Sequence, residues 1–224
     1  MITLIWHHIF YKKKLIATAV LLVCYIVILT AVVMTSDTPL DRKLFPIETY
    51  LYYQVVSKQI IVFVCAAMLA TIVFDFESSY DLPLYAYFSK SKVIHVKLVT
   101  HVFVVFVMAL LVATCRLGFA VLYYDFLDID FLLDNLWFIS DMMILCLWMI
   151  LLTPAKFKQS SFLVVAIYLL FMIISEDLTN PWLFYGLPFQ HHVYSSYHLT
   201  YIYVMIYGFM LYLLVYLKET YKAC

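Results

Sequence analysis

Histidine, cysteine and acidic side chains are the groups in this chain that could hold a metal ion or a haem. His191, His192 and His198 lie close together, but no acidic or thiol ligand accompanies them at the spacing of a zinc site. His95 and His101 are separated by six positions, which places them on different faces of a helix. We therefore expect no metal site, and an intramembrane haem or metal enzyme that uses the histidines is the alternative interpretation.

Two charged residues inside apolar segments are the next candidates for chemistry. Asp141 and Arg116 each interrupt a long apolar run, and a charge at that depth is costly unless it is paired or hydrated. We expect the two to form an intramembrane polar pair. The alternative is that Asp141 lies near the outer end of its span, about one and a half turns from it, and is solvated.

Other common chemistries lack their residues here. The five cysteines have no paired spacing, and three glycines cannot form a phosphate-binding loop. Lys plus Arg equals Asp plus Glu, at 14 each, so no net charge attracts nucleic acid. We expect the chain not to be an enzyme and to hold no cofactor, with any nucleotide chemistry carried by a partner.

The composition requires a lipid environment, since 67% of the residues are apolar and only 12% are charged. Continuous apolar runs of about 20 residues are typical of membrane-spanning helices. We expect an all-α membrane protein with one domain over residues 1–224. Its six spans are predicted at about 15–34, 55–74, 98–122, 136–153, 161–175 and 199–217.

The charges in the loops predict the orientation of the spans. Loops on one side hold ten basic and four acidic residues, and segments on the other side hold four basic and ten acidic ones. Basic residues collect in short cytosolic loops. The pattern therefore predicts a multi-pass plasma-membrane protein with both termini in the cytosol.

Three segments outside the spans are candidates for function. Residues 1–14 mix aromatic residues with three lysines and are predicted to form an interfacial helix. Pro83 favours the first turn of a short amphipathic helix over residues 79–92, which either docks to a partner or simply lies along the lipid. The stretch 176–198 is apolar but rich in turns, which predicts an external re-entrant segment before span six.

That external stretch and span six are rich in aromatic residues. Trp182, Phe184, Tyr197 and Tyr201 form a candidate surface for an amphipathic substrate. The alternative is an aromatic belt at the membrane interface.

The cytosolic loop and the order of the spans resemble those of ABC-2-type transporter permeases. Glu77 matches the acidic position that follows span two in that family, and Leu82 and Leu84 match the leucines of the turns after it. Ser91-Lys92 matches the family's S-R element, and Lys97 matches the lysine that opens span three. The family's proline before the serine is absent here.

The resemblance implies that the segment 79–92 is a coupling helix that docks to a separate ABC ATP-binding subunit, which carries ATP and Mg²⁺. It also implies pairing with a second copy or a related permease in the lipid bilayer. The cargo implied is an amphipathic peptide or lipid-like molecule, as in exporters of phenol-soluble modulins; a non-transporting scaffold or immunity protein is the alternative. The residues implied to contact the ATP-binding subunit are Glu77, Asp81, Leu84, Tyr85, Phe88, Lys90 and Lys92.

Overall fold

Helices make up the described part of the chain, apart from a bend at Phe88 and Ser89. The computed structural model describes residues 12–36, 47–53, 56–57, 69, 86–124, 129–152 and 197–221, and these residues contain helices and no strand. The predicted fifth span, the external segment 176–198, residues 1–11 and most of the second span lie outside the described residues.

Four long helices make up most of the described structure. They are α2 (Lys12–Ser36), α6 (Lys90–Tyr124), α7 (Ile129–Leu152) and α10 (Tyr197–Tyr221). They contain the first, third and sixth predicted spans and the fourth as far as residue 152, and all four extend beyond the predicted boundaries at one or both ends. Lys12–Lys14 belong to α2, so this part of the predicted interfacial helix is continuous with the first span.

Two of these helices are long and apolar enough to cross a membrane, as judged by length and composition. They are α6 and the part of α7 over Phe131–Leu152, and a shorter apolar helical stretch covers Ala19–Ala31. With 35 residues, α6 has a length of about 50 Å. A hydrocarbon core is about 30 Å thick, so α6 is long enough to extend well beyond it.

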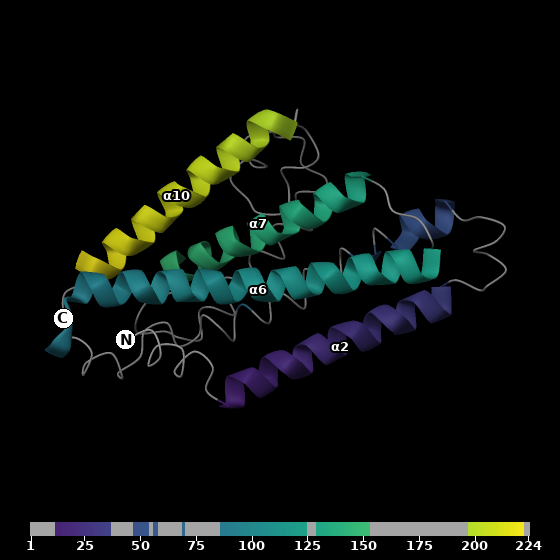
Figure 1. Cartoon of the computed structure of the whole chain (residues 1–224), viewed down its shortest axis with the longest axis horizontal. Coiled ribbons are helices and arrows are strands. Elements are labelled where there is room, and N and C mark those ends of the chain that lie inside the picture. Colours follow the sequence, from purple (N-terminus) through teal and green to yellow (C-terminus); the bar gives the residue numbers. More distant parts are fainter. Residues whose placement is uncertain are drawn as a thin grey trace.

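The α6, α7 and α10 helices pack against one another, with α7 and α10 antiparallel to α6. In Figure 1, α6 runs along the whole bundle, α7 and α10 lie on one side of it and run the opposite way, and α2 lies on the other side. In the 18-residue apolar stretch of each helix, 61% of the residues are buried in α7 and 44% are buried in α6. Trp137, Leu145 and Met149 of α7 are among the largest fully buried side chains, so α7 supplies much of the core.

A bend separates α6 from the residues that precede it. Residues 86–87 are helical, the chain bends at Phe88, and the Val93 amide donates to the Ser89 carbonyl over 3.1 Å. Ser89 is therefore the N-cap of α6. The predicted end of the coupling helix at residue 92 is wrong, because Lys90 and Lys92 form the first turn of α6.

Candidate functional site

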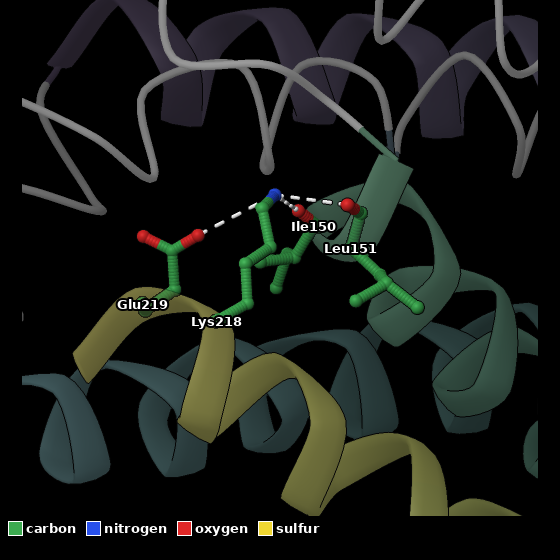
Figure 2. Close-up of polar contacts among 4 residues, drawn as sticks. All are labelled: Ile150, Leu151, Lys218 and Glu219. Atoms are coloured by element: carbon green, nitrogen blue, oxygen red, sulfur yellow. Dashed lines mark hydrogen bonds and ion pairs between the residues drawn. The ribbon is translucent and has the colours of Figure 1, made fainter. Parts of the chain in front are cut away.

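One polar cluster lies where α6 begins and where α7 and α10 end. We call this region, formed by Lys90, Lys97, Lys218 and Glu219, the lysine end. Lys218 of α10 donates from Nζ to the carbonyl oxygens of Ile150 (3.0 Å) and Leu151 (2.9 Å) on α7. Figure 2 shows the ammonium group between these carbonyls and the Glu219 carboxylate. Lys218 therefore caps the last turn of α7, where the backbone carbonyls lack helical partners.

Glu219 gives the lysine end its acidic group. Its Oε1 lies 3.5 Å from Lys218 Nζ, and its side chain is only 7% exposed. Burial raises the pKa of Glu219 above its ordinary value, and the positive charges of Lys218, Lys97 and Lys90 act in the opposite direction. The carboxylate is thus held among cations that lie on two helices.

Side-chain hydrogen bonds join the start of α6 directly to α10. The Ser91 and Tyr216 hydroxyl groups are hydrogen-bonded to each other, and the Tyr212 hydroxyl lies 2.6 Å from His95 Nδ1. The His95 ring also meets the Tyr212 and Tyr216 rings edge to face, at centroid distances of 6.1 Å and 6.4 Å. The first turns of α6 are therefore fixed to the last turns of α10, and Lys218 extends this connection to α7.

The residues implied to contact a partner can be placed only in part. Phe88 and Lys90 are half-buried and Lys92 is exposed, and all three lie at or just before the start of α6. Glu77, Asp81, Leu84 and Tyr85 lie outside the described residues. Contact with an ATP-binding subunit stays a prediction for all seven.

A second polar cluster surrounds Arg116 near the opposite end of α6. Arg116 is 1% exposed. Its Nε donates to Ser57 Oγ over 2.9 Å, one Nη lies 3.5 Å from Asn135 Oδ1, and its guanidinium carbon lies 4.4 Å from the centre of the Phe131 ring. We call Arg116, Ser57, Asn135 and Phe131 the arginine end.

Tyrosines enclose the arginine end. Tyr53 donates its hydroxyl to the Arg116 carbonyl over 2.7 Å, and its ring lies 5.1 Å from that of Tyr124. Tyr50 packs against Tyr124 and Phe131 with its ring edge. Tyr50 and Tyr53 thereby pack against both α6 and α7 at this end of the bundle.

Asp141 lies deeper than the sequence indicated. Because α7 begins at Ile129, Asp141 lies near the middle of the helix rather than one and a half turns from its outer end. Its side chain is only 1% exposed, which argues against a carboxylate solvated at the outer end of the span. The ion pair between Asp141 and Arg116 stays a prediction, because the Arg116 contacts described above involve Ser57, Asn135 and Phe131.

The other predicted site residues divide between described and undescribed parts of the chain. Tyr197 and Tyr201 lie in the first two turns of α10, where the backbone is described, while Trp182 and Phe184 lie outside the described residues. The prediction that His95 and His101 lie on different helix faces is confirmed, since His95 is exposed and His101 is buried. His101 Nδ1 lies 2.8 Å from the Lys97 carbonyl oxygen.

Sequence reasoning did not find several members of these two clusters. No group of three or more His, Cys, Asp or Glu side chains lies together among the described residues. The groups that do cluster include Ser57, Asn135, Lys218 and Glu219, which match no motif. The available signal was a polar residue within, or directly after, an apolar helix.

Comparison with known proteins gives no further assignment. No family model matches the chain, and the comparisons find no similar curated protein or solved structure.

Proposed function

We propose that the chain is the membrane-spanning permease subunit of an ATP-driven ABC exporter in the plasma membrane. In this proposal the lysine end faces the cytosol, six helices span the bilayer, and the subunit works with a second copy or a related permease. A separate subunit binds ATP and Mg²⁺. The cargo is an amphipathic peptide or a lipid-like molecule that moves outward.

The observation that carries the proposal is the connection of the start of α6 to the ends of α7 and α10. The predicted coupling helix directly precedes α6 in the sequence, and among the described residues 86–90 the chain bends at Phe88 and Ser89. A displacement of that helix acts first on α6. The Ser91–Tyr216 hydrogen bond and the Lys218 cap then transmit it to α10 and α7.

The location of the lysine end also supports this proposal. Basic residues are typical of the cytosolic ends of spans, and Lys90, Lys92, Lys97 and Lys218 gather where α6 begins and α10 ends. An ATP-binding subunit in the cytosol would meet the bundle on this side.

The experiment is to purify the tagged full-length chain from cells that also express a candidate ATP-binding subunit. We expect that subunit to copurify with the wild-type chain, and to be lost when Leu84 and Tyr85 are both replaced by Asp. Tyr221→Asp is the matched control, because Tyr221 is 81% exposed at the end of α10 and lies outside the predicted coupling helix. Equal recovery with the double variant would count against docking at this segment.

A further inference from the structure

The exposed face of α6 changes from basic to apolar along its length. Lys92 and His95 are exposed near the start of the helix. They are followed on the same face by Val99 and Phe103, which are 49% and 52% exposed. Spacings of three and four residues align these side chains in one stripe. The stripe thus has a polar head of two residues and an apolar continuation.

His95 is held in one orientation by α10. Its ring lies perpendicular to that of Tyr212, at an interplanar angle of 90°, and its Nδ1 lies 2.6 Å from the Tyr212 hydroxyl. With the tyrosine O–H donating to Nδ1, the ring proton lies on Nε2. His95 then presents an N–H donor one turn along the helix from the exposed Lys92 ammonium.

The charges around these two residues favour an anion. Lys90 and Lys97 lie on the same helix as Lys92 and His95, and together with Lys218 they place three positive charges around the single Glu219 carboxyl group. The start of α6 adds to the positive potential, because the N-terminal end of a helix dipole is positive and the first turn of α6 contains no acidic residue.

The length of α6 places the stripe at the membrane surface. Its 35 residues span about 50 Å, whereas the hydrocarbon core is about 30 Å thick. Its apolar part begins at Leu98, directly after Lys97. With the lysine end in the cytosol, Lys92 and His95 lie at the level of the lipid headgroups and Val99 and Phe103 lie at the level of the acyl chains.

We infer that Lys92 and His95 bind the phosphate of an anionic phospholipid of the cytosolic leaflet, and that an acyl chain of this lipid lies along Val99 and Phe103. Basic pockets beside spanning helices on the cytosolic side recognise anionic headgroups. The inference rests on the membrane orientation in the proposed function, but it requires neither transport nor an ATP-binding subunit.

The test is native mass spectrometry of the full-length chain with phosphatidylglycerol or phosphatidylcholine of identical acyl chains. A basic residue near the surface strengthens binding to anionic lipid by about fivefold. We expect the wild-type chain to prefer phosphatidylglycerol by at least about fivefold and Lys92→Gln to lose most of this preference. Tyr212→Phe, which removes the hydroxyl that orients His95, is expected to reduce the preference less.

Two matched controls make the result specific. Lys156→Gln removes the same charge from the predicted loop after span four. Tyr207→Phe removes a hydroxyl that accepts from Trp148 Nε1 over 2.7 Å. Both controls are expected to keep the lipid preference. Copurification of the ATP-binding subunit is measured on the same variants, so that failure of the lipid site and failure of the transporter proposal are distinguished.

Three results would overturn the lipid site. The first is equal binding of the two lipids by the wild-type chain. The second is that inorganic phosphate competes for the site as strongly as phosphatidylglycerol does, which would indicate a site for the free anion. The third is a Lys92→Gln variant that keeps its lipid preference but loses the ATP-binding subunit, which would assign this face to a protein.

Discussion

Lys218 Nζ lies 2.9 Å from the carbonyl oxygen of Leu151, so a side chain at the end of α10 caps the end of α7. The same ammonium group also donates to the Ile150 carbonyl and lies 3.5 Å from Glu219 Oε1. Hydrogen bonds of a charged donor are stronger than neutral ones. This one side chain therefore joins the ends of two helices that are far apart in the sequence.

Replacement of Lys218 is expected to lower the stability of the folded protein through the lysine end. Lys218→Met removes the cap on α7 and leaves the buried Glu219 carboxylate without its nearest cation, and we expect a loss of about 2 kcal/mol in stability. Lys218→Arg, which keeps a cationic donor, is expected to recover most of this loss. Thermal unfolding of the purified variants checks the prediction, and an unchanged midpoint for Lys218→Met would contradict it.

The stability of the protein is expected to depend on pH through the raised pKa of Glu219. Its pKa in the folded protein is raised above its ordinary value of 4.5. The folded state therefore holds the proton more tightly than the unfolded state does. This stabilisation is fully present below pH 4.5 and is lost as the pH rises through the raised pKa.

Glu219→Gln should remove that dependence. We expect the wild-type chain to lose stability relative to the Gln variant as the pH increases from about 4.5 toward neutrality. Parallel denaturation curves at several pH values provide the comparison. A wild-type chain that gains stability relative to the variant over this range would show that the lysines, rather than burial, dominate at Glu219.

Removal of the Ser57 hydroxyl is expected to destabilise the arginine end. Ser57→Ala leaves the Nε donor of the buried Arg116 without this acceptor, which should cost about 1–3 kcal/mol. Ser140→Ala is the matched control, since the Ser140 hydroxyl donates to the Leu136 carbonyl within its own helix, over 3.4 Å. Unfolding midpoints measure both variants, and equal small effects would contradict a structural role for Ser57.

A double-mutant cycle tests the predicted pair of Asp141 and Arg116. If the two charges interact, replacement of both by Asn and Gln should cost less than the sum of the single replacements. Interacting residues typically show a difference of about 0.5–3 kcal/mol. Additive losses in unfolding free energy would show that the two buried charges are stabilised independently.

The sequence allowed the main helices of the bundle to be predicted, because an apolar run long enough to span a bilayer is a strong local signal. It failed at boundaries where charged residues extend a helix. α7 begins at Ile129 and includes Asp130 in its first turn, where the helix dipole favours an acidic residue. The apolar run alone suggested a later start and placed Asp141 too close to the end.

The start of α6 was misplaced for the opposite reason. Lys90 and Lys92 are typical of a helix C-terminus, since cations are unfavourable at the N-terminal end of the dipole. In the structure they begin a helix, and Ser91 and His95 in the same turns bond to α10. Tertiary contacts therefore outweigh the local preference at this position.

The partners within each cluster depend on how the helices align. Arg116 was a candidate from its sequence position, but its contacts with Ser57 and Asn135 depend on how α6 is aligned with Ser57 and with α7. Lys218 bonds to backbone carbonyls, which every residue has, so no sequence pattern identifies its acceptors. Such contacts follow from three-dimensional packing alone.

The most direct test of the central proposal is the ATP hydrolysis rate of a candidate ATP-binding subunit, reconstituted in vesicles with and without this chain. We predict that the wild-type chain raises the rate and that an amphipathic peptide raises it further. Replacement of Leu84 and Tyr85 by Asp should abolish both increases, while Tyr221→Asp should preserve them. A rate that is the same with and without the chain, for a subunit that copurifies with it, would contradict the permease account.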